Sequence, residues 1–227
     1  MHTAMRRMPL VAAGLMALGG CAMLQSDADK GMSFFITSAG PGKGGDLGGL
    51  EGADRHCQSL AAAAAAGDRT WRAYLSTQGS ALNDPKVVHA RDRIGTGPWY
   101  NVKGARIARN VEQLHSARNN LNKETALDEK GRMVNGRTEK PNKHDILTGS
   151  RPDGTAFPGA FFPDMTCGNW TKSGPEGSAM TGHHDRAGPV EHAWATSWNS
   201  AHPTIGCNQD LVRKTGGDGL LYCFAVK

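Results

Sequence analysis

The chain has 227 residues, of which only 38% are apolar and 30 are glycines, and its formal net charge is +5 at pH 7. This composition supports a modest hydrophobic core held among long loops. The basic residues are spread along the sequence without forming a block, which argues against nucleic acid as a partner.

The N-terminal segment has the order of a secretory signal. It carries Arg6 and Arg7 and no acidic residue, continues as an apolar run over residues 9–17, and ends with small residues before Cys21. This is the sequence of regions in an exported precursor. The apolar run is well short of the roughly 20 residues that a membrane-spanning helix needs. We therefore predict a signal peptide over residues 1–20.

The end of this segment, Leu18-Gly19-Gly20-Cys21, resembles the lipobox of bacterial lipoproteins. The resemblance implies a diacylglyceryl thioether on the Cys21 sulfur, and two or more acyl chains anchor a protein durably in a membrane. The alternative is an ordinary secretory signal that happens to contain a cysteine. Because Ala22 rather than Asp follows, the resemblance favours the outer membrane of the cell envelope. Residues 21–31 then form a lipidated linker to a domain over residues 32–227.

The cysteines agree with an exported protein. With Cys21 lipidated, an even number remains, namely Cys57, Cys167, Cys207 and Cys223. In an oxidising compartment they predict two disulfides, for which the sequence allows three pairings, each long-range bridge contributing roughly 3 to 5 kcal/mol. The alternative is a zinc site, but no Cys or His pair has ligand spacing, and adjacent His183 and His184 cannot easily both turn to one ion. We therefore expect neither a metal nor a cofactor.

The domain is predicted to begin with a strand, a loop and a helix. Residues 33–37 are aromatic and β-branched, which is typical of a buried strand. The glycine-rich stretch 40–52 is a loop, and it lacks the Gly-Lys-Ser/Thr ending of a phosphate-binding loop. Residues 53–66 predict a helix that a glycine ends, with Cys57 and Leu60 on one face.

Later segments predict two more strands and a second helix. Residues 70–76 alternate large apolar and polar groups, as a half-buried strand does. A helix is predicted over residues 110–119, with Asn110 as its N-cap. From there onward, turn signals divide the chain into pieces too short for helices. Residues 220–226 are almost wholly apolar, so we expect this last strand in the middle of a sheet, with Cys223 tied to the core.

Several short motifs occur in an order similar to that of a known fold. A cysteine in the first helix precedes Trp71-Arg72-Ala73-Tyr74-Leu75-Ser76. The later motifs are Gly149-Ser150-Arg151-Pro152-Asp153-Gly154, Cys167-Gly168-Asn169-Trp170, the segment from Trp198 to Cys207, and Tyr222-Cys223. Together they resemble the C-type lectin-like fold, most closely its endostatin branch, the C-terminal module of certain collagens. The resemblance covers residues 33–226.

The resemblance implies an α+β, endostatin-like domain with two helices, a short mixed or antiparallel sheet and long loops. In that fold an outer bridge joins the first helix to the last strand, and an inner bridge closes the loop region. For this chain the implied disulfides are Cys57 with Cys223 and Cys167 with Cys207.

The ligand sites of the family do not transfer to this sequence. Sugar-binding members hold calcium through a Glu-Pro-Asn or Gln-Pro-Asp loop and a Trp-Asn-Asp strand. Here that strand is Trp198-Asn199-Ser200, so a hydroxyl replaces a carboxylate, although calcium needs six to eight oxygens, some of them charged. The near match to the loop motif at residues 139–142 has an inserted Lys and lies before Cys167. Of the endostatin sites, the zinc site lacks its N-terminal histidines, and the heparin site lacks a clustered set of arginines.

Catalysis is not expected. His183, His184 and Asp185, with Ser197 or Ser200 and Glu191 downstream, are residue types suited to acid-base or nucleophilic work. No nucleophile elbow or metallohydrolase signature frames them, and such a loop commonly uses these side chains in hydrogen bonds that hold a long coil.

We expect instead a non-enzymatic recognition or structural module, held at the cell envelope by its N-terminal lipid. Variation in this fold concentrates in the loops between Cys167 and Cys207, here called the loop face (residues 168–206). Tryptophans there offer stacking planes, although Trp170 and Trp198, beside core cysteines, are expected to pack in the core. The candidate ligand-binding residues are Trp194, Trp198, Asn199, His183, His184 and Asp185. The expected partner is an envelope or extracellular protein, and the alternative function is a glycan-binding lectin, calcium-dependent or not.

Overall fold

The computed structural model describes residue 1 and residues 31–226. The predicted signal peptide except Met1, Cys21 and all of the linker except Gly31 lie outside the described residues. Among the residues it describes, no helix has both the length and the apolar character needed to cross a membrane.

Strand β8 (Gly217–Ala225) is the centre of the main sheet. It pairs antiparallel with β1 (Phe34–Ile36) and β2 (Trp71–Ala73) and parallel with β5 (Asp145–Leu147). Beyond β5 the sheet continues through β6 (Met180–His183) and ends at β7 (His202–Pro203). The strand predicted at residues 220–226 is therefore confirmed, as is its place in the middle of a mixed sheet.

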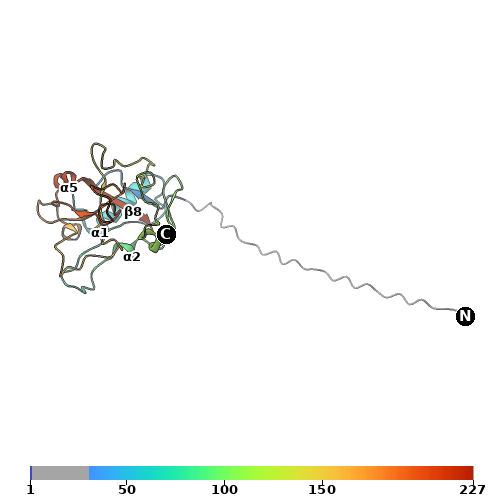
Figure 1. Ribbon diagram of the computed structural model, residues 1–227, viewed down its shortest axis with the longest axis horizontal. Coiled ribbons are helices and arrows are strands. Elements are labelled where there is room, and N and C mark those ends of the chain that lie inside the picture. The colour runs from blue at the N-terminus through green and yellow to red at the C-terminus, as the bar shows by residue number, and fades with distance from the viewer. Residues whose placement is uncertain (2–30, 227) are drawn as a thin grey trace.

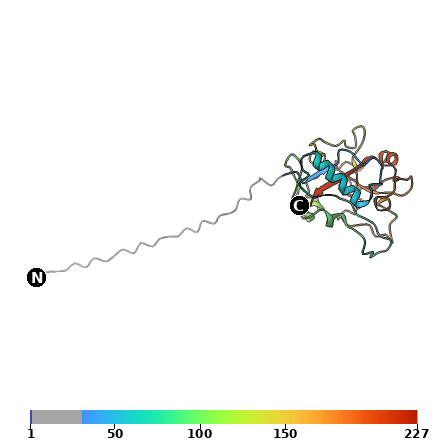
Figure 2. The ribbon, with the colours of Figure 1, turned by 180° about the vertical axis from the view of Figure 1, so that it is seen from behind.

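The longest helix, α1 (Gly49–Ala63), lies across this sheet, as Figures 1 and 2 show. It buries Ala53, Cys57 and Ala61, which recur every four residues and so share one face. The helix begins four residues earlier than predicted. Its first turn was not predicted because it contains two glycines, which are poor helix formers. A Cβ on Gly52 would come within 1.9 Å of the Leu47 carbonyl oxygen, so glycine is required there.

Alternate residues of β8 face two different parts of the core. Leu221, Cys223 and Ala225 pack with α1, whereas Tyr222 and Phe224 pack in a second cluster with Trp99, Ile107 and Trp198. This period of two is that of a strand buried on both faces. The second cluster lies under irregular segments rather than under a long helix. This agrees with the modest core among long loops that the glycine-rich composition predicts.

Both disulfides have the pairing that the resemblance implied. Cys57 of α1 is bonded to Cys223 of β8, at a sequence separation of 166 residues. Cys167 is bonded to Cys207, at a separation of 40 residues, so this bridge is nested inside the first. The outer bridge therefore ties the first helix to the central strand, and the inner one closes the base of the loop face.

The expected number of helices was wrong. Besides α1, the described residues contain one helix of seven residues and three single turns: α2 (Ala90–Arg93), α3 (Val111–Leu114), α4 (Cys167–Trp170) and α5 (Gln209–Thr215). The helix predicted at 110–119 ends at Leu114, although Asn110 does cap it by accepting a hydrogen bond from the Gln113 backbone. A two-stranded sheet of β3 (Trp99–Tyr100) and β4 (Arg106–Ala108) lies apart from the main sheet.

Candidate functional site

The loop face includes the edge of the main sheet that is formed by β7. It contains β6, β7 and the long connection between them, residues 184–201. Backbone hydrogen bonds from His183 to Ser197 and from Ala201 to Thr181 fix the last part of this connection to β6. The predicted ligand-binding residues all lie in this connection or at the end of β6.

Two of the predicted residues, Trp198 and Asn199, hold the connection to the core. The Trp198 ring packs on Tyr74 and Tyr222, with ring centroids 4.8 and 5.3 Å apart. The buried Asn199 amide donates to the Tyr74 hydroxyl at 2.9 Å and to the Arg151 and Pro152 carbonyls. These contacts occupy both side chains, so neither is displayed to a ligand at the surface.

Trp194 is the predicted residue that does reach the surface. Its side chain is 46% exposed, and Val190 in the same connection is exposed as well. The next residue, Ala195, is fully buried, and its carbonyl accepts a hydrogen bond from the His183 ring at 2.7 Å. The backbone beside Trp194 is therefore anchored while the indole projects outward.

His183 and His184 contact different partners, as expected of adjacent histidines. The Nε2 of His184 lies 3.2 Å from the Asn135 carbonyl oxygen, and burial lowers the pKa of this ring to about 4. The Nε2 of His183 instead lies 3.0 Å from the Nε2 of His202. Burial lowers the pKa of His183, but the facing Asp145 carboxylate outweighs burial and raises it above its usual value.

A cluster that the sequence did not reveal forms around His183. Asp145, the first residue of β5, is its direct partner in the β5–β6 register. The Oδ1 of Asp145 lies 3.2 Å from the His183 Nε2, 3.1 Å from the His144 Nε2 and 3.6 Å from the His202 Nε2. These four residues are here called the histidine cluster. Asp145, His183 and His202 lie on the adjacent strands β5, β6 and β7, and His144 immediately precedes β5. No sequence motif indicates their meeting, because it depends on strand register.

Within residues 31–226, the carboxylate at the centre of the histidine cluster has no hydrogen-bond partner. Asp145 is 1% exposed, and none of the described residues hydrogen-bonds either of its carboxylate oxygens. The ring nitrogens around it lie at ion-pair distance without hydrogen-bonding geometry. A buried ionised carboxylate without donors is costly, so this arrangement requires compensation by positive charge.

Asp185, the last predicted residue, supports the cluster from one side. Its Oδ1 lies 3.2 Å from the His144 Nδ1, and its carboxylate accepts backbone hydrogen bonds from Arg137 and Ala187. Although burial acts to raise it, these hydrogen bonds hold the pKa of Asp185 far below its usual value. Asp185 is thus an ionised acceptor that orients the His144 ring.

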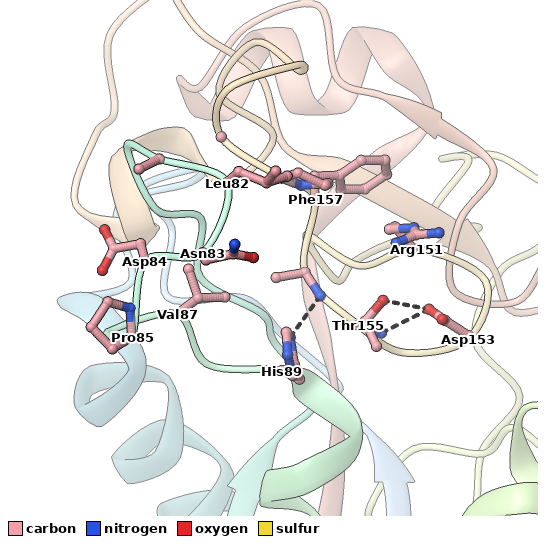
Figure 3. Close-up of a pocket in the computed structure, with 14 residues that line it drawn as sticks. Leu82, Asn83, Asp84, Pro85, Val87, His89, Arg151, Asp153, Thr155 and Phe157 are labelled. Carbon is pink, nitrogen blue, oxygen red and sulfur yellow. Dashed lines mark hydrogen bonds between the residues drawn. The ribbon is translucent and has the colours of Figure 1, made fainter.

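A hollow of the described surface lies elsewhere, between residues 81–89 and 151–159 (Figure 3). Leu82 and Phe157 lie together along one side of it. Its polar groups bond within the loops that form it: the His89 ring accepts from the Ala156 backbone, and Asp153 accepts from Thr155. None of the predicted ligand-binding residues lines this hollow.

No protein-family model matches the chain, and no curated protein matches it significantly. The function is therefore inferred from the geometry of its own residues.

Proposed function

We propose that this chain is a lipid-anchored protein of the cell envelope whose C-type lectin-like domain acts as a non-enzymatic recognition or structural module. The mixed α+β architecture and the nested disulfides support this assignment of the fold. Recognition takes place on the loop face, because loops carried on a rigid scaffold are suited to bind a partner.

The exposure of Trp194 is the observation that carries the proposal. A tryptophan presents a large apolar surface, and tryptophans are enriched among the residues that dominate binding energy at interfaces. Exposed Val190 and Ile205 belong to the same loop face. Because Ala195 is buried and bonded to His183, little conformational freedom is lost when a partner covers the neighbouring indole, and such preorganisation favours affinity.

Site-specific photo-crosslinking in intact cells tests this proposal. A photoreactive amino acid replaces Trp194 in one variant and Val102 in another, which is a matched control because Val102 is 43% exposed and lies outside the loop face. We expect discrete crosslinked species from position 194 and none from position 102. Equal crosslinking from both positions, or none from position 194, would contradict recognition through the loop face.

Glycan binding is the second candidate, because the exposed Trp194 indole offers a plane on which a sugar ring can stack. Calcium is not expected to take part, since the Asn199 amide is engaged in the core and Asp185 is bonded to its neighbours. Glycan arrays with the protein and with Trp194→Ala, each with and without added calcium, test this function. Binding that is independent of calcium and lost in Trp194→Ala would establish a lectin, and no binding would rule it out.

A further inference from the structure

The three histidines of the histidine cluster share one orientation. In each ring the Nδ1 is turned away from the cluster toward an oxygen that can only accept. The acceptors are the Asp185 carboxylate for His144 at 3.2 Å, the Ala195 carbonyl for His183 at 2.7 Å and the Pro203 carbonyl for His202 at 3.2 Å. The Nδ1 therefore carries the proton, and the Nε2 of each neutral ring presents a lone pair.

These lone pairs point at a negative charge. The Asp145 Oδ1 lies 3.1, 3.2 and 3.6 Å from the three Nε2 atoms, and the ligand atoms of His144, Asp145 and His183 all lie within 4.8 Å of one another. The ion-pair contacts of Asp145 within residues 31–226 are all with histidine rings. Lone pairs and a carboxylate in a buried space repel one another, and a cation among them converts this repulsion into attraction.

We propose that His144, Asp145 and His183 bind a divalent transition metal of the zinc type, with His202 as the fourth ligand. Imidazole nitrogens and one carboxylate are ligands that zinc prefers, whereas calcium needs six to eight oxygens. Tetrahedral zinc with bonds of about 2.0–2.1 Å places its ligand atoms ~3.3 Å apart. The three separations from the Asp145 Oδ1 and the separation of the His183 and His202 Nε2 atoms, 3.0–3.6 Å, are close to this value. His202 is not among the three residues whose ligand atoms all lie within 4.8 Å of one another, so its partly exposed ring must turn inward to complete the site.

The surroundings are those of a metal centre rather than of a chance cluster. The oxygens that accept from the three Nδ1 atoms fix the tautomer and aim each Nε2 inward, which is the role of the groups around zinc-binding histidines. The His202 side chain is 31% exposed, whereas those of the other three ligands are 6% exposed or less. The metal therefore enters at the His202 edge, and it links β5, β6 and β7.

Metal analysis and thermal melts of the purified full-length protein, with both disulfides formed, test the site. We expect one zinc ion per chain and a melting temperature that rises with added zinc, because a ligand of the folded state stabilises it by mass action. Asp145→Asn should bind zinc roughly 100-fold more weakly or not at all. His192→Gln is the matched control, since His192 is an exposed histidine of the same loop face, and it should bind as the unaltered protein does.

The metal-free melts distinguish a metal from a proton. If the site binds a metal, metal-free Asp145→Asn should melt at the same temperature as the unaltered metal-free protein or at a higher one. The substitution removes a buried charge that no cation compensates. If a protonated His183 pairs with Asp145 instead, Asp145→Asn should melt lower, and zinc should leave the unaltered protein unchanged. That pair of results would overturn the proposal.

Cobalt substitution gives a readout that does not depend on the folding of Asp145→Asn. Cobalt(II) bound to the unaltered protein should show the intense visible bands of tetrahedral coordination, and His144→Gln should lose them. Absence of such bands from the unaltered protein would overturn the site. None of these results depends on whether the loop face binds a partner.

Discussion

Single buried polar side chains hold the irregular segments of this protein to its core. The Trp170 indole donates to the Ser76 carbonyl at 2.8 Å, and the Tyr222 hydroxyl donates to the Trp198 carbonyl at 2.8 Å. Arg93 pairs with Asp54 at 2.8 Å and donates to the Ala73 carbonyl as well. Because loops contribute few backbone pairs of their own, such side-chain bonds decide where they lie.

Asn199 is the side chain whose loss should loosen this attachment of the loops to the core most clearly. Asn199→Ala would leave the Tyr74 hydroxyl and the carbonyls of Arg151 and Pro152 without their donor. We expect the free energy of unfolding to fall by about 2–3 kcal/mol, the cost of unpaired buried polar groups. Urea unfolding measures this loss, and the exposed Asn83→Ala should show no change. An unchanged stability of Asn199→Ala would mean that its amide is free to serve a ligand.

At the scale of the elements, the sequence predicted what depends on local composition. The aromatic and β-branched segment 33–37 and the apolar run 220–226 form strands, because short runs of adjacent apolar side chains are typical of strands buried on both faces. Helix α5 was missed although Asn208 caps it and Gly216 follows it, since it is only seven residues long. The histidine cluster was beyond prediction because it depends on the register that places Asp145 opposite His183.

The two disulfides should differ in their contributions. Chain entropy assigns about 5 kcal/mol to a bridge as long as Cys57–Cys223 and about 4 kcal/mol to one as long as Cys167–Cys207. We therefore expect replacement of both outer cysteines by serine to lower the free energy of unfolding more than the same change to the inner pair. Denaturant unfolding of the two double variants makes the comparison. A larger loss from the inner pair would show that the loop face, rather than the α1–β8 contact, limits stability.

The start of the described domain and the loop face lie at opposite edges of one sheet. Strand β1, which follows the predicted linker, is one edge, and β7 is the other. Four strand spacings separate them, or about 19 Å. Trp194 and the histidine cluster therefore lie on the far side of the sheet from the strand that follows the predicted linker.

We propose that a lipid on Cys21 holds this disulfide-closed domain at the envelope. Metabolic labelling with a fatty acid, followed by membrane fractionation, tests this anchoring. The unaltered protein should carry the label and fractionate with the outer membrane, because two or more acyl chains anchor it durably. Cys21→Ala should take up no label and should stay unprocessed or become soluble. A Cys21→Ala protein that still fractionates with the outer membrane would contradict the claim and place the anchor elsewhere.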